Sequence, residues 1–316
     1  MLAGRRPNLS IEITHECPLR CAGCYAYGDD HLGGGVRLRQ LADHQGQALI
    51  DGVMAAVRRL KPIHLSIVGG EPLVRFRELD VLLPKLTGMG IHTQVVTSAV
   101  RPIPAGWAGL ERLQVCVSVD GLRPEHDARR APATYDRILK HIHGQQVTIH
   151  CTVTRQQTRP GYLTEFVAFW AGQPDVRRIW FSLYTPQQGE ASDERLLPED
   201  RRRVVAEIRR LVDLHPKLHD MRPTLLEAYL DPPADPASCL FARSTSCVSS
   251  DLKTPIGPCQ FGGHPECREC GCMASAALDA VARHRLGGLV SVGTLFDMSE
   301  RVGRVARLAR HEHAEA

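Results

Sequence analysis

Residues 8–24, NLSIEITHECPLRCAGC, join a strand-like run directly to three closely spaced cysteines. The run Leu9–Thr14 is apolar and rich in β-branched residues, which predicts a β-strand. Cys17, Cys21 and Cys24 follow at once, with spacing C-x3-C-x2-C. The sequence therefore predicts a cysteine loop at the end of a first strand, and the remaining chain shows which kind of sheet that strand joins.

Similar runs recur at intervals of roughly 25 to 35 residues, with helical patterns between them. Strands alternating with helices indicate βαβ units and a parallel sheet. Six such units are too few for a closed eight-stranded barrel. The sequence thus predicts an α/β fold, a partial (β/α)6 TIM-like barrel with a C-terminal cysteine-rich metal-binding extension. The predicted strands are Leu9–Thr14, Ile63–Val68, Ile91–Thr97, Leu113–Val119, Gln146–Val153 and Arg178–Tyr184, and the predicted helices are Leu38–Leu60, Phe76–Leu86, Thr134–His143, Tyr162–Ala171, Pro198 to about Leu214, Ala274–Arg285 and about Ser299–Arg310.

Three regions are expected along the chain. Residues 1–185 form the partial barrel, 186–238 a helical linker, and 239–316 a cysteine-rich region with C-terminal helices. Within the linker, the run Arg201–Arg203 is expected to be a solvated helix face rather than a phosphate site. In a partial barrel, chemistry gathers at the carboxyl ends of the strands.

Composition excludes several classes of protein. The chain has 316 residues, and 39 basic against 35 acidic side chains give a formal charge of +4. This balance does not favour a nucleic acid or an anionic membrane as partner. No apolar run reaches the roughly 18 residues of a membrane span, and the N-terminus shows no secretory signal. We therefore expect a cytoplasmic protein without a membrane span.

Cysteine is the unusual residue. Eleven cysteines in a chain without a signal peptide suggest metal binding rather than disulfides. Three form the first group, and six more lie in the last quarter of the chain. Only Cys116 and Cys151 lie between the groups, and both are expected to be buried strand residues. The distribution of the cysteines therefore predicts two metal sites, one in each group.

The first group can hold three corners of a [4Fe–4S] cluster and leave the fourth iron open. A structural zinc site would require a fourth ligand, for which His15 is the nearby alternative. The open-iron interpretation is favoured by a second motif, Gly69-Gly70-Glu71, which lies at the end of the second predicted strand.

With these motifs in this order, residues 9 to 184 resemble the radical S-adenosylmethionine (radical SAM) superfamily. The resemblance implies that Cys17, Cys21 and Cys24 bind the cluster and that Gly69, Gly70 and Glu71 contact the methionine amino group. Many members carry an aromatic residue at the position of Gly23, and Tyr25 or Tyr27 could replace it.

A third match lies at the end of the fourth predicted strand. There Ser118 and Asp120 are followed by Arg130 in a segment of the form H-D-x-x-R. The resemblance implies contacts from these residues to the ribose or carboxylate of the cofactor. The alternative is an ordinary Asp-Gly turn before a helix.

The resemblance also implies the chemistry. SAM chelates the open iron, and one electron cleaves it to a 5′-deoxyadenosyl radical that acts on an organic substrate. The cofactor carries out the bond cleavage, and the protein positions the cofactor. A flavodoxin or ferredoxin is implied as the electron donor.

The second cysteine group looks like the SPASM and twitch extensions of this superfamily, although its spacing departs from the full SPASM pattern. Two fully ligated clusters would need about eight thiolates, so six favour one auxiliary [4Fe–4S] cluster. A structural zinc site is the alternative. The expected core ligands are Cys259, Cys267, Cys270 and Cys272, with Cys239 or Cys247 as replacements.

The substrate stays open. Because the first strand begins by about residue 9, no leader-binding domain is fused before it, which slightly favours a small molecule or lipid. The alternatives are a SPASM-type peptide maturase and, from another class, a non-catalytic iron–sulfur or zinc sensor or scaffold.

Overall fold

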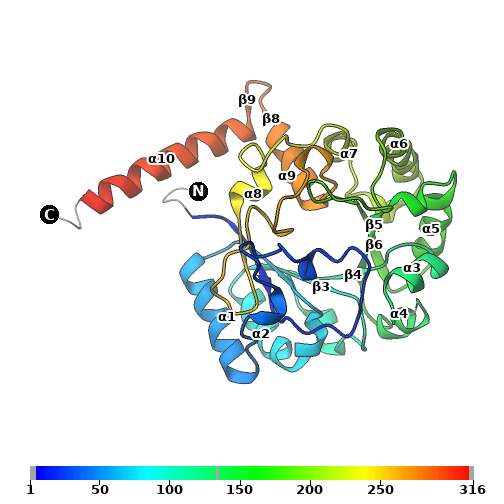
Figure 1. Ribbon diagram of the computed structural model, residues 1–316, viewed down its shortest axis with the longest axis horizontal. Helices are drawn as coiled ribbons and strands as arrows, with labels where there is room; N and C mark the ends of the chain where they lie inside the picture. The colour runs from blue at the N-terminus through cyan, green and yellow to red at the C-terminus, as the bar shows by residue number, and fades with distance from the viewer. Residues whose placement is uncertain (1–4, 133–134, 313–316) are drawn as a thin grey trace.

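A curved parallel sheet forms the centre of the protein in this computed structural model, which describes residues 5–132 and 135–312. Its strand order is β6-β5-β4-β3-β2-β1-β7 (Figure 1). Every pairing in this sheet is parallel, and β6 and β7 form its open edges. The strands are β1 Asn8–Glu12, β2 His64–Val68, β3 His92–Thr97, β4 Leu113–Ser118, β5 Val147–Val153, β6 Val176–Leu183 and β7 Thr245–Val248. The predicted α/β partial barrel is confirmed.

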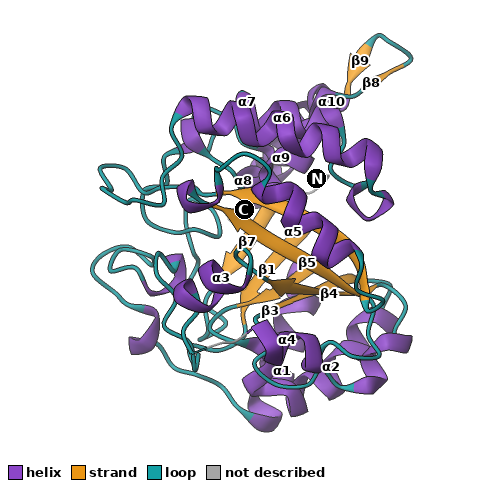
Figure 2. Ribbon diagram, turned by 90° about the vertical axis from the view of Figure 1, so that its right-hand side faces the viewer, coloured by secondary structure: helices purple, strands orange, loops and turns teal. Residues whose placement is uncertain are grey.

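Helices lie both above and below the strands in Figure 2, because a curved sheet whose neighbouring strands are joined by right-handed crossovers carries its helices around its outside. The predicted α5 and α6 agree with the observed bounds, and α9 begins one residue earlier than expected. The predicted helix Thr134–His143 is observed as α4, while residue 134 lies outside the described residues. The helices are α1 Gly46–Leu60, α2 Phe76–Gly88, α3 Arg123–Arg129, α4 Tyr135–His141, α5 Tyr162–Ala171, α6 Pro198–Leu214, α7 Pro223–Leu230, α8 Leu240–Ser244, α9 Met273–Arg283 and α10 Val292–Glu312.

Two predicted bounds were wrong at the N-terminal side of a helix. The first helix does not start at Leu38, because Leu38–Gln40 forms a separate 3-10 turn and extended backbone at Leu41 and Gln45 separates it from α1, which begins at Gly46. The last helix starts at Val292, after the hairpin of β8 (Arg285–Leu286) and β9 (Val290–Ser291). Figure 1 shows α10 projecting from the body of the protein.

The sheet has one strand more than predicted. Strand β7 pairs with β1 over Asn8–Thr245 to Ile11–Val248, so β1 is an interior strand with β2 on its other side. This strand comes from the region 239–316 but belongs to the same sheet as the first six. The three-region division remains a prediction.

The strands place apolar and polar residues on opposite faces, since successive side chains point to opposite sides. Leu9 and Ile11 in β1 join the hydrophobic core with residues of the covering helices. Ser10 and Glu12 alternate with them and are also buried. The interior face of the sheet therefore receives the polar residues. Within the described ranges, no helix has both the length and the hydropathy that crossing a bilayer requires.

Candidate functional site

The three-cysteine loop lies at the carboxyl ends of the central strands. Two backbone hydrogen bonds attach it to the segment that follows α3: Arg20 N–H donates to Ala131 O at 2.8 Å, and Ala22 N–H donates to Arg129 O at 3.2 Å. Because β1 and β4 are separated in the sheet by β2 and β3, the loop spans the mouth of the partial barrel.

The thiols of this loop suit thiolate ligation. Burial, together with the charges of Glu71, Cys21 and Cys24, raises the pKa of Cys17 to about 11. Burial also raises the pKa of Cys21 and of Cys24, while the charge of Arg130 lowers both. The three thiols therefore lie close enough to interact, beside a guanidinium that offsets negative charge. Three cysteine sulfurs in one loop are the donor set of a cluster with three thiolate ligands. Because the raised pKa values favour the protonated thiols, binding such a cluster would release their protons.

The Gly69-Gly70 pair fits against the same loop. Gly70 N–H donates to Thr14 O and Glu71 N–H donates to Glu16 O, each at 2.8 Å. Gly69 has a φ of 124°, and a Cβ on it would lie 2.8 Å from Thr14 O. A side chain at either glycine would displace the backbone that leads into the cysteines, so the glycines permit this close approach.

Glu71 is buried, and both of its carboxylate oxygens accept hydrogen bonds from this chain. Its carboxylate accepts hydrogen bonds from Leu73 N–H at 2.9 Å, Ser98 N–H at 2.7 Å and the Thr97 hydroxyl. Burial raises its pKa, although these hydrogen bonds act in the opposite direction. The carboxylate therefore ties the end of β2 to the end of β3 and fixes the backbone of the two glycines.

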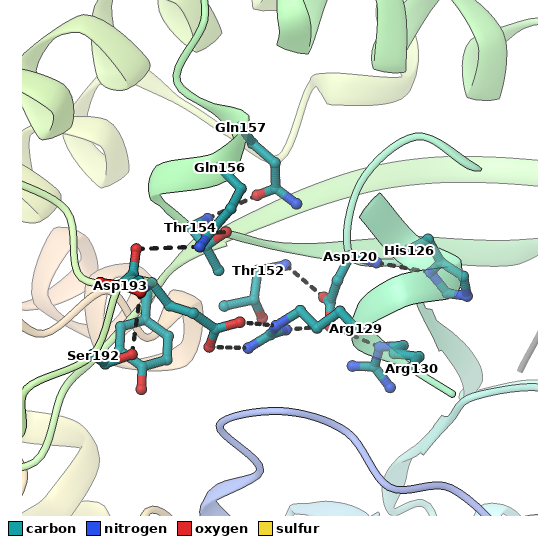
Figure 3. A network of polar contacts seen from close by, with 12 residues as sticks. Asp120, His126, Arg129, Arg130, Thr152, Thr154, Gln156, Gln157, Ser192 and Asp193 are labelled. Atoms are coloured by element: carbon teal, nitrogen blue, oxygen red, sulfur yellow. Dashed lines mark hydrogen bonds and ion pairs between the residues drawn. The ribbon is translucent and has the colours of Figure 1, made fainter. Parts of the chain in front are cut away.

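Asp120 is the centre of a buried ionic network (Figure 3). Its Oδ2 accepts from Arg130 Nε at 2.7 Å and from Arg129 Nη1, and its Oδ1 accepts from Thr152 N–H at 3.1 Å. Burial opposes ionisation, but the charges of Arg130 and Arg129 hold the pKa of Asp120 below its usual range. Arg130 also donates to Ser98 Oγ at 2.9 Å, which joins this network to the segment held by Glu71.

Arg129 extends the network to the loop after β6. Its guanidinium makes a two-pronged contact with Glu194, with Nε–Oε1 at 2.5 Å and Nη2–Oε2 at 2.9 Å. This geometry is the strongest form of arginine–carboxylate pairing. Arg130 was predicted from the sequence, but Arg129 and Glu194 were not, because the adjacent arginines have no spacing that separates their roles.

Two side chains that follow β6 in the chain, Tyr184 and Glu194, fill the space beside Gly23. Gly23 has a φ of 62°, and a Cβ there would lie 2.5 Å from Glu194 Oε2 and 3.5 Å from Tyr184 Cε2. An aromatic side chain at this position would collide with the carboxylate. Tyr25 points elsewhere, toward His31 and Phe261, with ring centroids 5.7 and 5.3 Å away.

The remaining predicted residue of this site, Ser118, ends β4 and is 8% exposed. Next to it, His126 supports the turn at Asp120. Its Nδ1 accepts from Asp120 N–H at 3.1 Å, so the ring is neutral with its proton on Nε2. Burial, together with the charge of Arg130, lowers the pKa of His126 to about 4.

This histidine makes stability depend on pH. Because the unfolded chain binds a proton near pH 6.5 and the folded chain only near pH 4, stability falls as the pH drops through that window. His126 alone should remove about 2 kcal/mol between pH 7 and pH 5. Urea unfolding at both pH values should therefore show a correspondingly smaller loss for His126→Asn, whose amide oxygen still accepts from Asp120. An equal loss in both proteins would contradict the assignment.

The C-terminal cysteines form a second site. Five of the six line one pocket together with Phe241, Phe261 and Ser275: Cys239, Cys259, Cys267, Cys270 and Cys272. Cys247 is absent from this lining and lies buried in β7. Among the described residues, no three His, Cys, Asp or Glu side chains are grouped as a finished site for a single metal ion. Five thiols around one apolar pocket nevertheless fit the thiolate set that a [4Fe–4S] cluster requires.

Arg201 supports the backbone that forms this pocket. The prediction that Arg201–Arg203 is a solvated helix face is therefore wrong for its first residue. Arg202 and Arg203 are exposed as expected, but Arg201 is buried. Its guanidinium donates to Tyr229 O at 2.9 Å, to Cys270 O at 3.0 Å and to Glu269 O. Two of these carbonyl groups lie in the Cys267–Cys272 segment and the third in α7, so the guanidinium fixes the segment against that helix. Cys116 and Cys151 are buried in β4 and β5, as predicted.

A larger groove adjoins the pocket. It encloses about 620 Å³ between the loop at Gly33-Gly34 and the segments at 234–236 and 257–267, and it shares Pro236, Pro265 and Cys267 with the pocket. Such a volume lies in the range of ligand sites.

The chain is similar to several known proteins, although no protein-family profile matches it. A PqqA peptide cyclase of Rhizobium meliloti (strain 1021) is 32% identical over 119 residues, which cover 36% of this chain and 29% of that protein. An Fe-coproporphyrin III synthase of Methanosarcina barkeri (strain Fusaro / DSM 804) is 26% identical over 165 residues, or 49% of this chain and 39% of that protein. The matches therefore span well under half the length of these relatives.

Solved structures share the fold. Streptococcus suis SuiB bound to the precursor peptide SuiA superimposes with a TM-score of 0.60 at 15% identity, covering 87% of this chain and 65% of that one. Native anSMEcpe with bound AdoMet gives 0.56 at 15% identity, covering 86% and 80%. These likenesses establish the architecture around the cysteine loop.

Proposed function

We propose that this chain is a radical SAM enzyme, which reductively cleaves S-adenosylmethionine and modifies a peptide. The observation that carries the proposal is the assembly of Cys17, Cys21 and Cys24 against Gly70 and Arg130 at one end of the sheet. Cys17, Cys21 and Cys24 would hold a [4Fe–4S] cluster, which would supply the electron for the reductive cleavage of S-adenosylmethionine.

The chain's own residues have distinct proposed roles. Asp120 and Glu71 are saturated by donors of the protein, so we assign them to positioning rather than to direct contact. Asp120 fixes Arg130 next to Cys21, where the guanidinium can pair with the methionine carboxylate. Glu71 fixes the glycines, whose backbone lies beside the cysteine loop. Tyr184 and Glu194 occupy the space at Gly23 and border the cofactor there.

A substitution at Glu71 tests the positioning role. Glu71→Gln keeps the size of the side chain but replaces one carboxylate oxygen by an NH2 group. The N–H of Ser98 then loses its acceptor. A lost buried hydrogen bond costs about 1–3 kcal/mol, so we expect the affinity for SAM to fall by about tenfold or more with the iron content unchanged. Equilibrium binding and iron analysis of the same preparation check both parts. Loss of iron would instead give Glu71 a structural role in the cluster loop.

The peptide assignment rests on the relatives rather than on the site alone. The PqqA peptide cyclases and the SuiB–SuiA complex carry peptides in their names, which favours the peptide alternative over the small molecule or lipid preferred from sequence. The groove along Gly33-Gly34 and Gly257 is open and encloses about 620 Å³, which suits an extended chain. The match to the Fe-coproporphyrin III synthase supports a tetrapyrrole as the second candidate.

Isotope transfer distinguishes these substrates. The enzyme is supplied with SAM, dithionite and a perdeuterated bacterial extract, and 5′-deoxyadenosine is analysed by mass spectrometry. A peptide substrate should transfer deuterium to 5′-deoxyadenosine, and protease treatment of the extract should remove that transfer. Deuterium that survives protease would exclude the peptide and favour a small molecule, a lipid or the tetrapyrrole.

Two further expectations complete the proposal. One auxiliary [4Fe–4S] cluster in the C-terminal pocket is supported by its five thiols, with zinc as the alternative. A flavodoxin or ferredoxin is proposed as the electron donor, and the cytoplasm as the location, because the proposed chemistry needs a strong one-electron reductant and reduced thiols.

A further inference from the structure

A buried acid–base pair lies between the two cysteine sites. His31 Nε2 is 2.7 Å from Glu12 Oε1, and both side chains are at most 1% exposed. Glu12 ends β1, and His31 follows the turn that begins after Cys24. The second carboxylate oxygen of Glu12 accepts from Ser249 Oγ at 2.7 Å, and Ser249 directly follows β7.

The protonation state follows from the partners. His31 Nδ1 is 2.9 Å from Phe261 O, and because a carbonyl oxygen only accepts, this nitrogen carries a proton. Both oxygens of Glu12 accept hydrogen bonds, so Nε2 donates as well. Burial alone would lower the pKa of His31, but the hydrogen bonds and charge of Glu12 and the Phe261 carbonyl outweigh it and raise the pKa. The raised pKa of His31 favours an imidazolium facing Glu12, and the two side chains are each held by two polar contacts.

Aromatic contacts connect this pair to the cysteines on either side. Tyr25 follows Cys24 directly in the chain and packs against the ring of His31. It also meets Phe261 edge-on, with an interplanar angle of 86°. Phe261 lies two residues after Cys259 and lines the C-terminal pocket. A continuous packed path therefore runs from Cys259 through Phe261, His31 and Tyr25 to Cys24.

We propose that His31 and Glu12 are positioning residues that couple the two cysteine sites, so that filling the C-terminal pocket tunes the metal centre at Cys17, Cys21 and Cys24. Breaking a buried ion pair leaves an uncompensated charge, so its members are held in one arrangement. A ligand bound at Cys259 fixes Phe261, whose carbonyl and ring hold His31 and Tyr25. Tyr25 then sets how far solvent reaches Cys24, and solvent exposure is one determinant of a cluster's reduction potential.

This inference rests on the proposed function only in requiring a redox-active centre at the first loop. The test is a double-mutant cycle on the midpoint potential of that centre, measured by redox titration with EPR detection and without SAM. The C-terminal pocket is emptied by Cys259→Ala with Cys270→Ala. The cycle combines this change with His31→Gln, and with His143→Gln as a control, since His143 is 87% exposed after α4.

Emptying the pocket should shift the potential in the wild-type background and in His143→Gln, and the shift should disappear in His31→Gln. Glu12→Gln is the substitute variant if His31→Gln fails to fold. It keeps an acceptor for His31 without the charge, so it should fold and show a smaller shift of the potential. A shift of equal size with and without His31 or Glu12, or no shift in the wild type, overturns the coupling. Failure to load any iron at the first loop would instead contradict the proposed function.

Discussion

Cys24→Ala is expected to abolish the formation of 5′-deoxyadenosine from SAM under dithionite. Two thiolates cannot replace the three that hold the proposed cluster, and the chemistry belongs to the cofactor, so the rate should fall by at least about 100-fold. Liquid chromatography with mass spectrometry of anaerobic reactions measures the product. Iron content, determined on the same sample, should fall as well.

The matched control is Cys116→Ala. Cys116 is 1% exposed in β4 and lies apart from both cysteine groups in the sequence, so removing its sulfur should cost some stability and leave the product unchanged. Turnover that persists in Cys24→Ala would disprove the assignment of the cysteine loop. Equal loss in both variants would show damage to the fold rather than to the site.

Iron analysis of the C-terminal pocket is expected to give the second large effect. A protein with Cys17, Cys21 and Cys24 all changed to Ala isolates this pocket, and anaerobic reconstitution should yield about four irons with matching sulfide per chain. Adding Cys270→Ala should lower both values to near zero, because Cys270 lines the pocket and its carbonyl is held by Arg201.

Adding Cys247→Ala to the same background should leave iron and sulfide unchanged, since Cys247 lies in β7 and outside the pocket lining. Iron that depends on Cys247 and survives loss of Cys270 would contradict the ligand set. One zinc per chain without sulfide would make the pocket a structural site and leave a single-cluster enzyme.

Local patterns explain why most of the architecture could be predicted from sequence. The runs around Ile67 and Ile149 are apolar, short and separated by helical segments, which is the signature of a parallel sheet. Strand β7 was missed because Thr245–Val248 spans four residues and includes Cys247, so it was interpreted as part of the metal-binding loop. Its identity depends on pairing with β1, more than two hundred residues earlier, and periodicity carries no information on such a partner.

In the candidate site too, the local features could be predicted from the sequence and the long-range contacts could not. The cysteine spacing and Gly69-Gly70-Glu71 are local signals and could be found directly. The partners that fix them lie far away in the sequence, as in the pairing of Arg129 with Glu194 and the hydrogen bonds of Arg201 to Cys270 O. Each of these arginines looks like a surface charge in the sequence, and only burial reveals its role.

The position of β7 beside β1 has a consequence for synthesis. Strand β1 is the first to leave the ribosome and β7 the last strand of the sheet, so one edge of β1 stays unpaired while the intervening chain is translated. An open edge with Leu9 and Ile11 is a template for pairing with other chains. Pairings of such large sequence separation also form slowly. The nascent protein thus completes its sheet late, just before four of the five cysteines that line the second pocket emerge. Chaperone protection during translation would serve this edge.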